Sequence, residues 1–211
     1  MAATQDKLTF FHSPNSRSTG TLALLEELGV PYDLQFIDMK AGEQRGAKYL
    51  AVNPMGKVPA VRHGGALVTE QVAIFIYLAD LYPAAGLAPP IGDPLRGPYL
   101  RWLVFYGSSF EPAVSDRALK REPGPPSTMP YGDFDTTIAT LKGQLAPGPW
   151  ILGECFTAAD VLWGTALTWT TGFGLVSADE PIKSYLARWN ARPSVARAGA
   201  IDAKLLAGGA Q

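Results

Sequence analysis

A short polar loop near the start of the chain holds side chains that could bind an anion and stabilise a reacting atom. Ser13, Asn15, Ser16 and Arg17 stand close together in it. Hydroxyl, amide and guanidinium groups all donate hydrogen bonds, and the helical pattern that follows would add the partial positive charge of a helix N-terminus. A simpler interpretation also stands, because Asn15 or Ser16 could merely cap that helix.

Composition narrows the chemistry that this loop could serve. The chain has 211 residues, with 18 basic and 19 acidic side chains and a formal net charge of −1. Since no basic stripe stands out, nucleic acid is not an expected partner, and a bound anion must be held by local geometry. With the single cysteine Cys155 and only two histidines, His12 and His63, we expect no metal site. We predict that Cys155 is a buried structural thiol and that His12 ends a strand.

Nothing in the sequence predicts secretion or membrane insertion. The first residues, 1–7, carry no apolar segment typical of a secretory signal. No apolar run is long enough to span a bilayer, and a lone cysteine fits a reducing compartment. We therefore expect a soluble cytoplasmic protein without a membrane partner.

The first part of the chain alternates strand and helix signals. Short β-prone runs predict strands at 8–11, 32–37, 58–61 and 66–68. One helix ends at Gly29, where Pro31 follows, a short weak helix covers 42–50, and another helix stops before Pro83. The predicted order is βαβαββα.

The second part of the chain predicts helices only. Residues 84–98 are rich in Pro, Gly and Ala and read as a linker. We therefore assign 1–83 to an α/β domain and 99–211 to an all-helical domain, with helices around 99–110, 134–145, after Thr157, over 182–189 and after Pro193. Thr157 and Asp160 form a capping-box pattern, which we assign to folding.

Several motifs, in one order along the chain, resemble the bacterial glutathione transferases. They are the loop 13–18 ahead of 24–29, the segment 53–59, which is similar to N-P-x-G-K-V-P, the turn 69–71, and the N-capping box 156–160. By this resemblance the chain is identified as a member of the cytosolic glutathione S-transferase family, of a serine-type, theta-like or related class. The resemblance implies a thioredoxin-like glutathione-binding domain followed by a C-terminal helical bundle.

For catalysis, the resemblance implies a hydrogen-bond donor to the glutathione thiolate in the first loop. Ser13 precedes Arg17 by four residues, which is similar to the serine that donates to the thiolate in serine-type transferases. Asn15 and Ser16 compete for that role, and a related bacterial class uses a Thr-x-Asn pair at what would be Ser13 and Asn15. The sequence leaves the three candidates open.

For glutathione binding, the resemblance implies further contacts. Pro59 would be cis, and the backbone of Val58 would pair with the cysteinyl backbone of glutathione as an added strand. Lys57 and Arg17 would add positive charge. Glu70 would bind the γ-glutamyl amino group, although it could also be only a favourable charge in a first helical turn.

Gln71 is a departure from the family pattern. The family usually has Ser or Thr at this position, whose hydroxyl and amide take the α-carboxylate of glutathione. Gln71 keeps the amide and can donate from its side chain, but it is longer.

In the helical half, the aromatic residues Trp102, Tyr106 and Phe110 would line the electrophile pocket, although such a stripe also fits core packing. The resemblance implies a homodimeric enzyme that adds glutathione, as co-substrate, to small apolar electrophiles without a metal or a covalently bound cofactor. The alternatives are a glutathione-dependent isomerase, reductase or ether-cleaving enzyme, or a non-catalytic binding protein on this fold.

Overall fold

The computed structural model describes residues 7–208, so the residues 1–6 that bear on a secretory signal lie outside the described part. By their contacts the described residues divide into two compact units. One comprises 7–81 together with 193–208, and the other comprises 82–192. None of the helices within 7–208 is long and apolar enough to cross a membrane.

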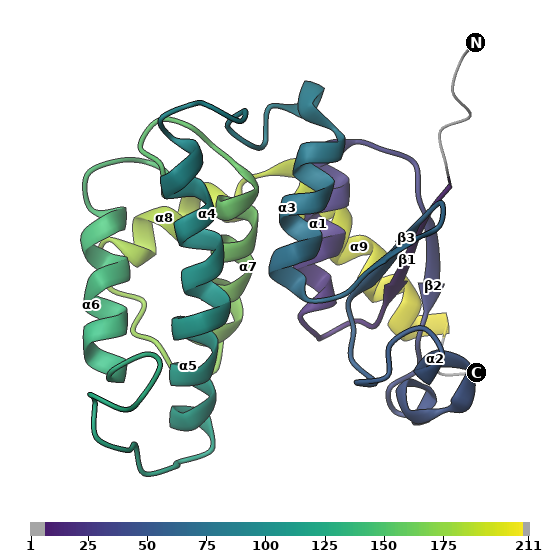
Figure 1. The fold of residues 1–211 in the computed structure, drawn as a ribbon, viewed down its shortest axis with the longest axis horizontal. Helices are drawn as coiled ribbons and strands as arrows, with labels where there is room; N and C mark the ends of the chain where they lie inside the picture. The colour runs from purple at the N-terminus through teal and green to yellow at the C-terminus, as the bar shows by residue number, and fades with distance from the viewer. Residues whose placement is uncertain (1–6, 209–211) are drawn as a thin grey trace. The chain divides into compact units, whose positions relative to one another are not determined.

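The first unit is built on a four-stranded mixed sheet (Figure 1). Its strands are β1 (Leu8–His12), β2 (Asp33–Phe36), β3 (Ala60–His63) and β4 (Ala66–Val68). Their order is β2-β1-β3-β4, with β1 parallel to β2 and β3 antiparallel to both of its neighbours. This arrangement confirms the predicted thioredoxin-like βαβαββα order.

The helices of this unit bury continuous apolar faces. They are α1 (Ser18–Leu28), the short α2 (Ala47–Leu50) after a 3-10 turn η1 (Glu43–Arg45), and α3 (Gln71–Leu81). Leu22, Leu24 and Leu25 of α1 are fully buried. The helix ends at Gly29, whose φ of 65° is the left-handed C-cap that glycine favours.

The third strand begins two residues later than predicted. Ala60 is its first residue, whereas the sequence pattern suggested Val58. β3 lies between β1 and β4, and a proline cannot donate to the ladder of an interior strand. The strand therefore starts after Pro59, and Val58 is left in the preceding segment instead of on an exposed strand edge.

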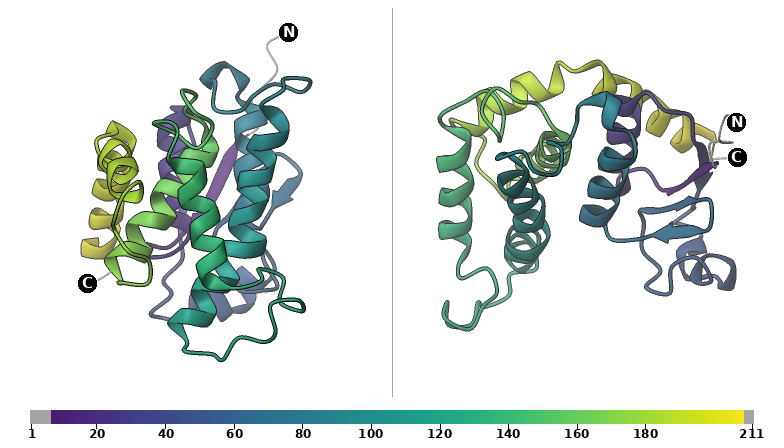
Figure 2. Two further views of the ribbon diagram at one scale, coloured as in Figure 1. Left: turned by 90° about the vertical axis from the view of Figure 1, so that its left-hand side faces the viewer. Right: turned by 45° about the horizontal axis from the view of Figure 1, so that its top comes forward.

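The second unit is helical (Figure 1). Its elements are η2 (Pro83–Ala85), α4 (Arg96–Phe105), η3 (Tyr106–Phe110), α5 (Glu111–Ala118), α6 (Phe134–Leu145), α7 (Ala158–Gly172) and α8 (Ile182–Asn190). α4, η3 and α5 form one continuous helical run (Figure 2). The η3 segment is a π-helical turn that ends two residues before Pro112, a residue that has no N–H for the regular helical ladder.

The last helix, α9 (Pro193–Gly208), lies beside α1 in the first unit (Figure 1). Ser194 donates to Glu27 at 2.5 Å, and Arg197 donates to Glu26 at 2.8 Å. The sequence-based assignment of 99–211 to the helical domain therefore differs from the contacts over 193–208. Side chains that pair helices far apart in sequence are not visible in a local pattern.

Candidate active site

Three segments that were predicted to bind glutathione meet at one edge of the sheet. β1 ends where β3 begins, because Phe11 pairs with Ala60. β4 ends at that same edge, because Val68 pairs with Val61. The loop after β1, the segment before β3 and the turn after β4 are thereby brought together, as the topology of antiparallel neighbours requires.

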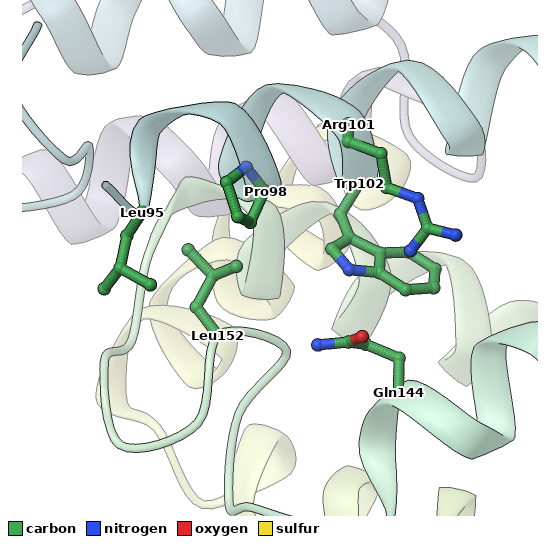
Figure 3. A pocket seen from close by; sticks show the side chains of 6 residues that line it. All are labelled: Leu95, Pro98, Arg101, Trp102, Gln144 and Leu152. Carbon is green, nitrogen blue, oxygen red and sulfur yellow. The ribbon is translucent and has the colours of Figure 1, made fainter. Parts of the chain in front are cut away.

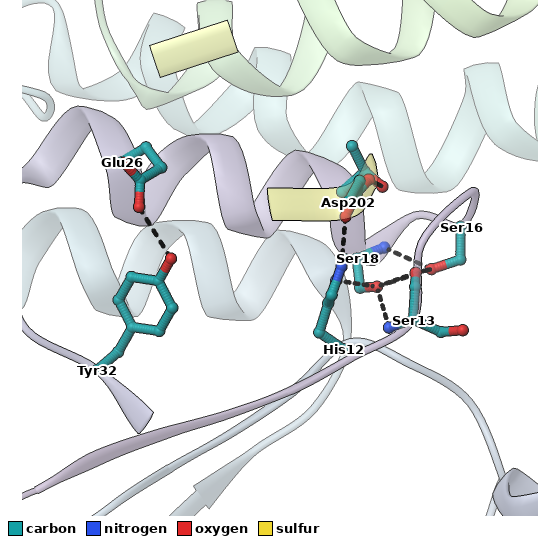
Figure 4. A network of polar contacts seen from close by, with 8 residues as sticks. His12, Ser13, Ser16, Ser18, Glu26, Tyr32 and Asp202 are labelled. Carbon is teal, nitrogen blue, oxygen red and sulfur yellow. Dashed lines mark hydrogen bonds and ion pairs between the residues drawn. The ribbon is translucent and has the colours of Figure 1, made fainter. Parts of the chain in front are cut away.

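The loop after β1 holds Ser13 by its backbone (Figure 4). The Ser13 amide donates to Ser18 Oγ at 3.1 Å, and the Ser13 carbonyl accepts from Ser16 Oγ at 2.7 Å. The Ser13 hydroxyl makes no hydrogen bond among residues 7–208, and in Figure 4 it points away from these contacts. Ser13 is only 5% exposed, and both polar groups of its backbone are held.

Ser16 is used inside the loop. Its hydroxyl donates to the Ser13 carbonyl, lies 2.7 Å from Ser18 Oγ, and accepts from the Ser18 amide at 3.1 Å. Ser18 is the first residue of α1, so Ser16 satisfies one of the amides that a helix start leaves unpaired. Ser16 therefore supports the helix start from one residue before the N-cap, which is Arg17.

Asn15 and Arg17 are exposed on this loop. Asn15 has φ 57°, a left-handed conformation that Asn tolerates better than most residues, and its side chain makes no hydrogen bond within 7–208. Asn15 therefore does not cap α1. The Arg17 carbonyl accepts from Gln71 Nε2 at 2.9 Å, which ties this loop to the start of α3.

The segment before β3 is fixed through the carbonyl of Lys57. That oxygen accepts from Tyr49 Oη at 2.7 Å and from Asn53 Nδ2 at 2.9 Å. Burial raises the pKa of Tyr49 to about 12, so its hydroxyl keeps the proton that it donates. The Lys57 side chain itself is exposed.

The Val58–Pro59 peptide bond is cis, as the resemblance implied. The Val58 side chain packs on a small apolar cluster that includes Phe11 and Tyr49. Its backbone N–H and C=O form no hydrogen bond among the described residues. Both groups remain available for an extended peptide that would pair with this segment.

Glu70 lies immediately before α3 instead of in its first turn. It is exposed, and its φ of 64° is uncommon for a residue with a side chain. Its carboxylate makes no hydrogen bond within 7–208. A strained backbone position beside a helix N-terminus is typical of binding sites. Gln71, in contrast, directs its side-chain amide to the Arg17 carbonyl.

The three aromatic residues predicted to contact the electrophile are buried in the helical unit. Trp102, Tyr106 and Phe110 pack around Trp163, with ring centroids 6.0, 5.7 and 5.0 Å from it. Trp163 also donates its indole N–H to the Trp102 carbonyl at 3.1 Å. In this structure these side chains form core packing, which was the alternative interpretation of the stripe.

Trp102 also lines a surface hollow of about 590 Å³ (Figure 3). Its other lining residues are Leu95, Pro98, Arg101, Gln144 and Leu152. The Arg101 guanidinium lies 3.8 Å from the centre of the Trp102 ring, which is close contact for a cation–π pair. Tyr106 and Phe110 do not line this hollow.

The remaining sequence expectations for Cys155 and His12 have different outcomes. Cys155 is exposed, so the prediction of a buried thiol is wrong; it lies in a surface turn, where it forms an isolated bridge with Leu152. His12 ends β1 as expected and is fully buried. Within 7–208 there is no cluster of three or more metal-ligating side chains.

Some residues of the site were missed by sequence reasoning. Tyr49 and Asn53, which hold the Lys57 carbonyl, gave no signal beyond the position of Asn53 inside the 53–59 motif. Ser18 was included in the first motif but was given no role, although it contacts both backbone groups of Ser13. Spacing alone cannot report these contacts, since they depend on the folded turn.

Comparison with known proteins agrees with this geometry. The family model for the glutathione S-transferase N-terminal domain matches residues 6–80. The glutathione S-transferase GstA of Escherichia coli O157:H7 is 29% identical over 191 residues, which cover 89% of this chain and 95% of that protein.

Solved structures extend the likeness over both units. A glutathione transferase from Methylococcus capsulatus is 30% identical, covers 93% of this chain and 98% of its own, and superposes with a TM-score of 0.79. A sphingomonad glutathione S-transferase complexed with glutathione is 29% identical over 92% of this chain and 98% of its own, with a TM-score of 0.76. The chain therefore belongs to the glutathione S-transferase family of enzymes.

Proposed function

We propose that this enzyme adds the thiolate of glutathione to small apolar electrophiles, with the Ser13 hydroxyl as the donor that stabilises the thiolate. The observation that carries the proposal is the state of Ser13. Its backbone is held on both sides by side chains, while its hydroxyl has no partner among the described residues. Ser16 is a weaker candidate because its hydroxyl already serves the loop.

The proposed chemistry requires a thiolate at neutral pH. A free cysteine-type thiol has a pKa near 8.5, so only about 3% of it is ionised at pH 7. A hydrogen bond to a charged group contributes about 1.5–3 kcal/mol, which corresponds to about one to two pKa units. One hydroxyl donor beside a helix N-terminus is therefore sufficient to populate the nucleophile.

The sheet edge supplies the proposed binding contacts for the rest of glutathione. The unpaired backbone of Val58 next to Pro59 would bind the cysteinyl unit. The Glu70 carboxylate would bind the γ-glutamyl amino group, and the amide of Gln71 would bind the α-carboxylate at the start of α3. Lys57 and Arg17 would add positive charge near the glycine carboxylate and the sulfur.

The electrophile is proposed to bind on the helical unit. Trp102 is the leading candidate contact, because it lines the hollow described above together with Arg101 and Gln144. Tyr106 and Phe110 would contribute by shaping the wall around Trp163. From the family we also infer that the working form is a homodimer.

A comparison of Ser13→Ala with Asn15→Ala tests the thiolate donor. Ser13→Ala should raise the pKa of the bound glutathione thiol by about one to two units and lower kcat toward chlorodinitrobenzene at neutral pH by about ten- to a hundredfold. Glutathione affinity should change little. The thiol pKa is followed by the ultraviolet absorbance of the thiolate during a pH titration of the complex.

Asn15→Ala is the matched control, since Asn15 is the other loop side chain without a partner. It should leave the thiol pKa unchanged. If Asn15→Ala slows conjugation more than Ser13→Ala, the assignment of Ser13 is wrong. If the wild-type protein neither binds immobilised glutathione nor shifts its thiol pKa, the transferase proposal fails as a whole.

A further inference from the structure

A buried chain of hydrogen bonds joins the C-terminal helix to the loop that carries Ser13 (Figure 4). Asp202 of α9 lies with Oδ1 2.6 Å from His12 Nε2, and His12 Nδ1 lies 2.8 Å from Ser18 Oγ. The second oxygen of Asp202 accepts from Thr19 Oγ1 at 2.8 Å. His12 and Ser18 are fully buried, so water does not compete for the contact between them.

The hydrogen positions in this chain follow from its chemistry. An ionised carboxylate can only accept, so Nε2 of His12 carries a hydrogen that it donates to Asp202. In a singly protonated ring, Nδ1 then accepts from the Ser18 hydroxyl. Ser18 Oγ keeps its lone pairs for the amide of Ser13, which donates to it at 3.1 Å. The contact with Asp202 thus orients the imidazole ring whose other nitrogen meets Ser18 Oγ.

Ser18 is the residue that connects the hydrogen bonds of Asp202 and His12 to Ser13. Its hydroxyl oxygen lies within 3.1 Å of the Ser13 nitrogen and 3.0 Å of the Ser13 carbonyl oxygen, and within 2.7 Å of Ser16 Oγ. If Ser18 rotates, the bond from the Ser13 amide is lost, while the Ser13 carbonyl keeps its bond from Ser16 Oγ. The orientation of the Ser13 hydroxyl thus depends on a side chain that His12 holds.

We propose that His12 and Asp202 are positioning residues for the Ser13 hydroxyl and act on it through Ser18. This inference rests on the proposed role of Ser13 as thiolate donor and deepens it. Neither residue would touch glutathione. Their effect would be to keep the donor within hydrogen-bond distance of the sulfur without a cost of reorganisation when the thiolate forms.

A purely structural role for Asp202, in docking α9, is the competing explanation. α9 is already tied to α1 by exposed or partly buried contacts, Arg197 to Glu26 at 2.8 Å and Ser194 to Glu27 at 2.5 Å. These contacts lie on α1 residues near its C-terminal end, away from Ser13. They provide a matched control, because they fasten the same two helices without reaching the loop.

The experiment compares Asp202→Ala, Asp202→Asn and Arg197→Met in the full chain. For each variant the melting temperature, the Kd for glutathione, the thiol pKa of the bound glutathione and kcat with chlorodinitrobenzene are measured. Asp202→Ala should raise the thiol pKa by about one unit and lower kcat at neutral pH about tenfold. Asp202→Asn should have a thiol pKa and a kcat between those of Asp202→Ala and the wild type, since its amide oxygen can still accept from His12.

Arg197→Met should lower the melting temperature but leave the thiol pKa and kcat at their wild-type values. Ser18→Ala, which keeps the pair of Asp202 and His12, should reproduce the rise in thiol pKa, and it decides the question if Asp202→Ala does not fold. The inference is overturned if Ser18→Ala leaves the thiol pKa unchanged or if Asp202→Ala behaves like Arg197→Met.

Failure of this inference can be distinguished from failure of the proposed function. If Ser13→Ala raises the thiol pKa while Asp202→Ala and Ser18→Ala do not, Ser13 is the donor. Its position then does not depend on the hydrogen bonds that run from Asp202 through His12 to Ser18. If Ser13→Ala itself has no effect, the role of Ser13 is wrong, and the positioning role of Asp202 is overturned with it.

Discussion

Gly56 lies in the segment 53–59, which we propose to bind glutathione, and has no room for a side chain. Its φ is 60°, and a Cβ atom there would lie 2.7 Å from the backbone carbonyl oxygen of Gln44. An L-residue in the left-handed region costs about 1–2 kcal/mol, and the clash with a backbone atom adds to this. Gly56→Ala should therefore displace the 53–59 segment and weaken glutathione binding by at least tenfold in a calorimetric titration.

Gly29→Ala is the control for that prediction. Gly29 has a similar φ of 65°, but no atom lies within 4 Å of the position of its Cβ. The variant should lose only about 1–2 kcal/mol of stability and keep its affinity for glutathione. Equal losses of affinity in the two variants would mean that backbone strain, and not the contact with Gln44, is responsible.

At this scale the sequence predicted the candidate loop but could not choose among its hydroxyls. Ser13 and Ser16 have the same chemical type, and their roles differ only because Ser16 is turned toward the Ser13 carbonyl. Asp202 stands 190 residues from His12, so no local pattern connects them. Aromatic spacing likewise could not distinguish core from pocket at Tyr106 and Phe110.

At the scale of the elements, the start of α7 is fixed by a buried carboxylate. Asp160 accepts from the amide of Ile151 at 2.7 Å, from the amide of Thr157 at 2.9 Å and from Tyr185 Oη at 3.1 Å. The predicted capping box is therefore present. It also fastens the preceding turn and α8 to the helix, which the motif did not indicate.

This carboxylate predicts a dependence of stability on pH. Burial raises the pKa of Asp160 from 3.8 to about 6, although its hydrogen bonds act in the opposite direction. Between these values the folded state binds more protons than the unfolded state, so the contribution of Asp160 to the free energy of unfolding falls as pH rises. The full change is about 3 kcal/mol, and it is complete above the folded pKa.

Urea unfolding of the wild type and Asp160→Asn across this pH window tests the prediction. The Asn variant should be less stable by about 1–3 kcal/mol at low pH, because its amide nitrogen would face the Thr157 amide. The difference between the two proteins should shrink as pH rises from about 4 to about 6. A difference that grows with pH would show that Asp160 is stabilised as the anion.

The elements themselves were largely predictable, and the exceptions have physical reasons. The helix over 134–145 is found with the predicted bounds, because its apolar face and its flanking Pro and Gly residues are local signals. The predicted start of β3 was wrong because it was based on the apolar run that begins at Val58. That pattern takes no account of the N–H that Pro59 lacks. The assignment of α9 to a unit depends on tertiary contacts with Glu26 and Glu27.

At the scale of the whole molecule, the chain returns to its first unit at its C-terminal end. By its contacts, α9 belongs to the first unit, together with the sheet and α1. Residues 82–192 form the helical unit. All five tryptophans of the chain lie in that helical unit, at Trp102, Trp150, Trp163, Trp169 and Trp189. Tryptophan fluorescence therefore reports on the helical unit, and the proposed binding of glutathione reports on the first unit.

These separate reporters make the role of α9 testable by a chain that ends at Arg192. Such a chain lacks Asp202, so His12 would lose its carboxylate partner, and the apolar face of α1 that α9 covers would be open to water. We expect glutathione binding to be lost, while the emission maximum of the tryptophans stays near that of the full chain. The reason is that the aromatic cluster around Trp163 is formed within 82–192.

A shift of the emission maximum to that of the urea-unfolded protein would contradict this prediction and would mean that the helical unit needs α9 to fold. Retained glutathione binding would instead contradict the expectation that the first unit needs α9 in order to bind glutathione.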